Sequence, residues 1–179
     1  SCNNLAFLYA KKREYVKCES LYIEAKTICE KIFGKNNFNY ANACDNLAFL
    51  YSKQGLYDKA ELLHIEAKDI MEKTLGKEHY YYANACNNLA LLYSNKELYD
   101  KAESLYMEAK NIYENKFGKE HPKYAVSCNN LAIMYQKNGK YAKAEPLYIE
   151  GNQAILSQID RNFSNLSEKE KRIYYNTFN

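Results

Sequence analysis

The chain has 179 residues, a hydrophobic share of 47% and a formal net charge of +3 at pH 7. This composition fits a folded globular protein and argues against a disordered one. The nearly balanced charge also argues against direct nucleic-acid binding, since a nucleic-acid-binding domain is usually far more basic. Six Gly and two Pro among 179 residues favour helices over a turn-rich β fold.

The sequence repeats with a period of 42 residues. The motif Asn/Asp-Asn-Leu-Ala occupies 3–6, 45–48, 87–90 and 129–132, always in the same register. Tyr and Glu positions recur with the same period further along each unit. A fixed period of this length is typical of an array in which each unit is one supersecondary element.

Each unit is predicted to hold two helices, because its apolar residues recur at spacings of three and four. Glycines that follow the apolar runs mark the helix ends, and Pro122 suits the first turn of a helix. The predicted first helices are 1–12, 39–53, 81–95 and 122–138, and the predicted second helices are 15–33, 57–75, 99–117 and 141–158.

The last unit and the tail depart from this pattern. Gly151 stands where the other units have Ala, and glycine inside a helix costs roughly 1 kcal/mol relative to alanine. A weaker second helix with a hinge is therefore predicted there, although the glycine also fits the simple end of an array. Ser167 and Glu170 form a capping box that predicts the start of a further helix.

The repeated residues resemble the tetratricopeptide repeat in its 42-residue form, which occurs in kinesin light chains and many bacterial repeat proteins. The resemblance rests on 46–51 (Asn-Leu-Ala-Phe-Leu-Tyr), 55–57 (Gly-Leu-Tyr), Ala60-Glu61 and Ala67, with Cys44 at the place of the signature Trp. It implies an all-α, right-handed superhelical solenoid of antiparallel helix pairs. Residues 1–159 would form four such pairs, the first truncated, and 160–179 a tail leading towards a missing downstream domain.

A second resemblance concerns the tail. Residues 162–178 (Asn-Phe-Ser-Asn-Leu-Ser-Glu-Lys-Glu-Lys-Arg-Ile-Tyr-Tyr-Asn-Thr-Phe) are similar to the segment that joins such repeats to a CHAT domain, a caspase-like cysteine protease. This implies a non-catalytic scaffold, the repeat arm of a larger bacterial protease, which docks a protein partner such as an RNA-guided CRISPR effector. Two alternatives remain open: a stand-alone kinesin-light-chain-like peptide-binding adaptor, and a fragment with proteolytic activity of its own.

The expected partner-binding surface lies on the first helices, whose equivalent face lines the groove in the resembling family. Each Asn carboxamide both donates and accepts hydrogen bonds and so suits an extended peptide. The alternative is that some of these amides bond within or between repeats. The candidate partner-binding residues are Asn4, Asn42, Asp45, Asn46, Phe49, Lys53, Asn84, Asn87, Asn88, Leu91, Asn95, Asn129, Asn130 and Ile133.

No cofactor or metal site is expected. His64 falls on a second helix, while His79 and His121 fall in equivalent loops, and the sequence lacks a Cys-x-x-Cys pair or a phosphate-binding glycine loop. The cysteines at 2, 44, 86 and 128 recur with the repeat and are expected to be packing residues. With no long apolar run and no signal-peptide pattern, the sequence predicts a cytoplasmic protein that does not enter a membrane.

Overall fold

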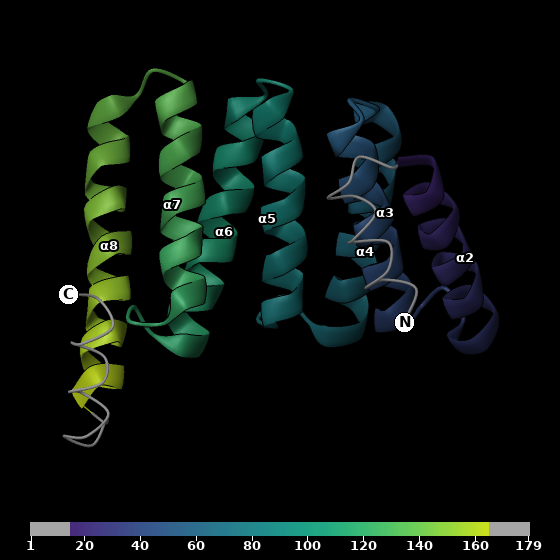
Figure 1. Ribbon diagram of the computed structural model, residues 1–179, viewed down its shortest axis with the longest axis horizontal. Coiled ribbons are helices and arrows are strands. Elements are labelled where there is room, and N and C mark those ends of the chain that lie inside the picture. The colour runs from purple at the N-terminus through teal and green to yellow at the C-terminus, as the bar shows by residue number, and fades with distance from the viewer. Residues whose placement is uncertain (1–14, 165–179) are drawn as a thin grey trace, which may run out of the picture. The chain divides into compact units, whose positions relative to one another are not determined.

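The structure, a computed structural model, describes residues 15–164, which fold into seven α-helices without a strand (Figure 1). Short turns join the helices, and consecutive helices within a compact unit pack antiparallel. The all-α class expected from the sequence is confirmed. The helices are α2 (Tyr15–Phe33), α3 (Phe38–Lys53), α4 (Tyr57–Leu75), α5 (Tyr80–Asn95), α6 (Tyr99–Phe117), α7 (Pro122–Lys137) and α8 (Tyr141–Ser164).

The chain divides into two compact units, residues 1–112 and 113–179. In the first unit α2 packs on α3, α3 on α4, and α4 on α5. Large side chains of α3 and α5 fill the space between these helices, and small residues allow their backbones to approach. Fully buried side chains of this unit include Tyr40, Cys44, Ala48, Leu50, Ala60, Ala67, Tyr82, Cys86 and Leu92.

In the second unit α7 packs against α8. The α7 helix contributes large buried side chains, Tyr124, Leu131 and Met134. The buried positions of α8 are small by comparison: Ala144, Gly151 and Ala154. The two helices are therefore close neighbours over the middle of α8.

The helix ranges predicted from the repeat are confirmed closely. Each of α2, α4 and α6 has the predicted bounds, and the ends of α3, α5 and α7 differ by at most one residue. Only α8 departs by more, since it continues to Ser164 instead of ending at 158. The predicted helix over 1–12 and the capping box at Ser167 lie outside the described residues.

The loop histidines act as helix caps. The Nδ1 atom of His79 accepts a hydrogen bond from the Tyr81 amide at 3.2 Å, and Nδ1 of His121 accepts one from the Lys123 amide at 3.1 Å. Each satisfies an amide that the first turn of a helix would otherwise leave unpaired.

Glycine's freedom to adopt a positive φ ends the first helices of two units. Gly55 has a φ of 78° and Gly139 a φ of 70°. The equivalent residue between α5 and α6 is Glu97, whose φ is 61°. A side chain in this left-handed conformation is strained by crowding of its Cβ against the following carbonyl oxygen.

We therefore expect Glu97→Gly to raise the free energy of unfolding by about 1 kcal/mol, because glycine adopts the positive φ without strain. The greater conformational freedom of glycine in the unfolded chain offsets only part of this stabilisation. Urea denaturation measures the change. Gly55→Ala is the matched control and should be destabilising by a similar amount. An unchanged or lowered midpoint for Glu97→Gly would show that the turn is not strained.

The hinge predicted at Gly151 is not visible as a break, because α8 runs through this residue as continuous helix. Gly151 is buried, and a Cβ atom there would lie 2.7 Å from Oδ1 of Asn129 and 3.2 Å from the carbonyl oxygen of Ala125. The glycine is thus explained by close approach of α7 and α8. Helix propensity alone had suggested a hinge, but packing decides this position.

Candidate functional site

A small pocket opens on the first unit where α3, α4 and α5 meet. Its volume, open to a water-sized group, is about 20 Å³. Phe49 and Leu91 are partly exposed beside it, at 41% and 37%, and Nζ of Lys53 lies 5.1 Å from the centre of the Phe49 ring. The pocket is lined by Phe49, Ser52 and Lys53 of α3, His64 of α4, and Asn88, Leu91, Leu92 and Asn95 of α5.

A buried polar network adjoins the pocket through His64 and Asn88, which line it. Nδ1 of His64 is 2.6 Å from Oδ1 of Asp45, and the two residues are only 1% and 8% exposed. Nδ2 of Asn88 donates a hydrogen bond to Oδ2 of the same carboxylate. Both oxygens of Asp45 are thus satisfied, and one carboxylate joins three helices, as a buried charge requires.

This network is a departure from the repeat. At the position of Asp45 the other three sequence repeats have Asn, at 3, 87 and 129. At the position of His64 they have Tyr, at 22, 106 and 148. The two residues that differ are the two in hydrogen-bond contact. The shorter His side chain occupies less space than the Tyr of the sister units, and the pocket lies beside it.

The pocket gathers five of the predicted partner-binding residues. Phe49, Lys53, Asn88, Leu91 and Asn95 line it together. Two others lie one or two turns earlier on α3: Asn42 is exposed and Asn46 half-buried. Their spacing from Phe49 and Lys53 places them on the same side of α3, and among the described residues neither side chain has a hydrogen-bond partner.

Other predicted residues do not join this pocket. Asn84 lies on the first turns of α5 and is half-buried, whereas Asn129, Asn130 and Ile133 lie on α7 in the second unit. The side-chain oxygens of Asn87 and Asn129 are buried and have no hydrogen-bond partner within residues 15–164. Asp45 is directed into the His64 pair, and Asn4 lies outside the described residues.

His64 is the member of this site that sequence reasoning missed. Its place on a second helix separates it in sequence from the asparagine-bearing face, and a histidine at such a position suggests only a metal ligand. The available signal was the paired departure of positions 45 and 64 from an otherwise regular repeat.

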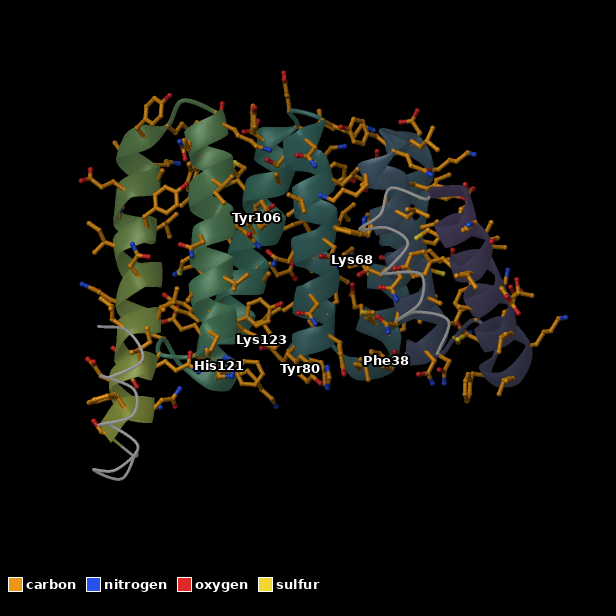
Figure 2. All side chains as sticks on the ribbon, in the orientation of Figure 1. Phe38, Lys68, Tyr80, Tyr106, His121 and Lys123 are labelled. Atoms are coloured by element: carbon orange, nitrogen blue, oxygen red, sulfur yellow. The ribbon has the colours of Figure 1, made fainter. Side chains whose placement is uncertain are left out.

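A second network recurs in successive units. Tyr40 donates its hydroxyl to Glu66 at 3.0 Å, and Tyr82 donates to Glu108 at the same distance. The thiol of Cys44 lies 3.9 Å from the other oxygen of Glu66. Lys26 lies over the Tyr40 ring, and Lys68, labelled in Figure 2, lies over the Tyr82 ring at 5.5 Å. These bonds link second helices to first helices and are structural.

The environment of the repeated cysteines keeps them protonated. Burial, reinforced by the nearby glutamate, raises the pKa of Cys44 and of Cys86 to about 12. A thiol needs to ionise to act as a nucleophile, so these two thiols are inert near neutral pH. Their burial and protonation agree with the packing role expected from the sequence.

An aromatic cluster marks one end of the first unit. The ring centres of Phe38 and Tyr81 are 4.3 Å apart, those of Tyr80 and Tyr81 are 4.2 Å apart, and His79 stacks on both tyrosines. Figure 2 shows Phe38 and Tyr80 at the same edge. The cluster packs the first turn of α3 against that of α5.

Among residues 15–164, no group of three or more His, Cys, Asp or Glu side chains converges as a metal site would require. In the same range, no helix is both long and apolar enough to span a bilayer.

The helix arrangement is similar to that of several solved structures. BtubC (BKLC) from P. vanneervenii is 23% identical with a TM-score of 0.77, and the match covers 88% of this chain and 63% of that one. A candidate kinesin light chain from Podosopora anserina with nearly identical TPR-like repeats is 24% identical with a TM-score of 0.76, covering 94% of this chain and 76% of that one.

The apo form of RapI is also similar in fold, at 15% identity and a TM-score of 0.74, with 99% of this chain and 66% of that one covered. This chain thus spans 63% of the length of BtubC. At these identities the likeness concerns the fold alone.

No curated protein sequence matches the chain. The family model described as tetratricopeptide repeat matches residues 2–73, 41–114 and 82–151, which overlap and together cover most of the chain. The chain therefore belongs to the tetratricopeptide repeat family.

Proposed function

We propose that the face of the first unit formed by α3 and α5 binds an extended segment of a partner protein. Tetratricopeptide repeats typically bind proteins or peptides and serve as interaction scaffolds. The observation that carries the proposal for this face is the pocket, which brings apolar and hydrogen-bonding side chains from two first helices to one place.

The chemistry of the face suits a peptide backbone. Phe49 and Leu91 offer apolar surface on either side of the pocket, while the amides of Asn42 and Asn46 each offer a donor and an acceptor. An extended segment presents backbone N–H and C=O groups along its length and side chains on alternate sides. Apolar contacts would supply affinity, and the amides would fix the register of the segment.

Binding of selected peptides tests this face. Peptides selected from a phage-displayed library of random dodecamers should bind the purified chain, and Phe49→Ala with Leu91→Ala should weaken their binding at least about tenfold, since both side chains would be buried by the ligand. Fluorescence anisotropy with a labelled selected peptide measures the affinity.

Leu62→Ala is the matched control. Leu62 is an apolar residue of α4 that is 72% exposed and does not line the pocket. It should leave affinity unchanged. Equal losses in both variants, or selection of peptides that bind elsewhere, would count against the α3–α5 face.

The proposal has a finer form, in which these repeats are the arm of a CHAT-type cysteine protease that docks a partner such as an RNA-guided CRISPR effector. The similarity of residues 162–178 to the segment that precedes a CHAT domain supports it. The coding sequence beyond position 179 tests it directly. A following domain with a His and Cys pair is the expected result, and a stop codon at that point would contradict the protease arm while leaving the peptide-binding face intact.

A further inference from the structure

We propose that the pocket beside His64 is a subsite for a hydroxyl side chain, Ser or Thr, of the peptide bound on the α3–α5 face. The inference rests on the proposed function of that face and adds a residue preference at one position of the ligand.

The sister units show what the pocket lacks. The sequence repeat that contains His64 is the second, and at the equivalent position the fourth repeat has Tyr148. The hydroxyl of Tyr148 donates a 2.7 Å hydrogen bond to Oε1 of Gln136. Gln136 occupies the position of Ser52, which lines the pocket beside His64. In the third repeat the equivalent residue, Tyr106, is 1% exposed, so its side chain is buried at this position. The pocket therefore stands where the hydroxylated end of a tyrosine lies in a neighbouring unit.

The size of the pocket limits the group that enters. About 20 Å³ open to a water-sized group is little more than one water needs. A hydroxyl fits this space. An aromatic ring or a carboxamide does not.

The polar atoms select a group that both donates and accepts. Asp45 contacts Nδ1 of His64, an arrangement that calls for a proton on Nδ1, and a neutral ring then keeps Nε2 as its hydrogen-bond acceptor. His64 also lines the pocket. Lys53 also lines the pocket, where its ammonium is a hydrogen-bond donor and the only fixed charge among the lining residues. A ligand ammonium would be repelled by Lys53, and a carboxylate has no proton to give to Nε2. A hydroxyl has both capacities, since it can donate to an imidazole nitrogen and accept from an ammonium.

The carboxylate of Asp45 makes this arrangement specific. It accepts hydrogen bonds from His64 and Asn88 together, which holds the imidazole at one tautomer and one orientation. Asp45 of α3 contacts His64 directly, Lys53 of α3 lines the pocket with it, and the pocket residues of α5 are not titratable.

The experiment uses sets of biotinylated decapeptides derived from a selected binder, in which each position in turn is Ser, Thr, Ala, Val, Asp or Tyr, at pH 8.5, where imidazole is neutral in water. At one position of the peptide, Thr should give an affinity about 5–10-fold higher than its isostere Val, which is the effect of one satisfied hydrogen bond. In the double variant Asp45→Asn with His64→Tyr, which installs the residues of the sister units, this preference should vanish while the other positions keep theirs.

A second variant, Asp45→Asn alone, keeps the imidazole but removes the carboxylate that orients it, and should lower the Thr preference without filling the pocket. Circular dichroism melts establish that each variant is folded. Equal binding of Thr and Val at every position, a preference for Asp, or a Thr preference that survives in the double variant would overturn the subsite. If no peptide binds the wild-type chain, the proposed peptide-binding face itself fails. If peptides bind without a hydroxyl preference, only the subsite fails.

Discussion

Replacing His64 by Ala should lower the free energy of unfolding of the first unit by about 3–4 kcal/mol. The substitution removes a side chain that is 1% exposed and leaves the carboxylate of Asp45, 8% exposed, without its closest hydrogen-bond partner. Breaking a buried pair by removing one member typically costs about 3–5 kcal/mol, and the remaining Asn88 bond offsets part of that loss. Chemical denaturation followed by circular dichroism measures the change.

The double variant Asp45→Asn with His64→Tyr distinguishes the network from simple loss of volume. The two substitutions install the pair found in the third sequence repeat, Asn87 and Tyr106. They also remove the buried carboxylate of Asp45. We expect it to recover most of the stability lost in His64→Ala, because replacing both members of a buried pair is often neutral. A His64→Ala variant that unfolds within about 1 kcal/mol of wild type would show that Asp45 is not held by the imidazole.

The helices could be predicted almost to the residue because the repeat supplies four aligned copies of each signal. A glycine such as Gly55 ends a helix where φ becomes positive, and its recurrence removes the ambiguity of a single glycine. Glu97 breaks the rule in one copy, yet the turn keeps its conformation. The surrounding helices therefore impose a backbone geometry that this residue alone would not favour.

The candidate site could be predicted only in part. The sequence placed Asn42, Asp45 and Asn46 on one face of a helix, but three residues within two turns span an angle wide enough for one of them to point inward. The rotation of α3 against α4 decides that Asp45 is buried while Asn42 is exposed. Periodicity fixes the spacing of side chains along a helix, whereas packing against neighbours fixes which of them reach solvent.

The role of each asparagine also differs between copies for the same reason. Asn88 donates to Asp45 because that position is acidic in the preceding unit, so part of the predicted binding ladder is structural in this copy. Substituting Asn88 by Ala would disturb both the network and the pocket. Asn46 is the better position at which to separate binding from folding.

Gly151→Ala should destabilise the second unit by about 1–2 kcal/mol, although alanine is the better helix former. At a solvent-exposed helical position the same change would be stabilising by about 1 kcal/mol. Here the added Cβ would lie 2.7 Å from Oδ1 of Asn129 and 3.2 Å from a backbone oxygen, so α7 and α8 have to shift apart or the Asn129 side chain has to move. Forcing extra volume into a packed interface typically costs about 1–3 kcal/mol.

A double-mutant cycle with Asn129→Ala isolates this contact. Truncating Asn129 removes the nearest atom, and it also removes a buried oxygen that has no hydrogen-bond partner in the described part of the chain. Gly151→Ala should therefore be neutral or stabilising in that background. We expect a coupling free energy of at least about 1 kcal/mol between the two substitutions, measured by urea denaturation. Asn152→Ala, at the exposed neighbouring position of α8, reports helix propensity alone and should be slightly stabilising. Stabilisation by Gly151→Ala in the wild-type background would mean that the two helices separate at little cost, and the hinge at Gly151 would again be the better explanation for its glycine.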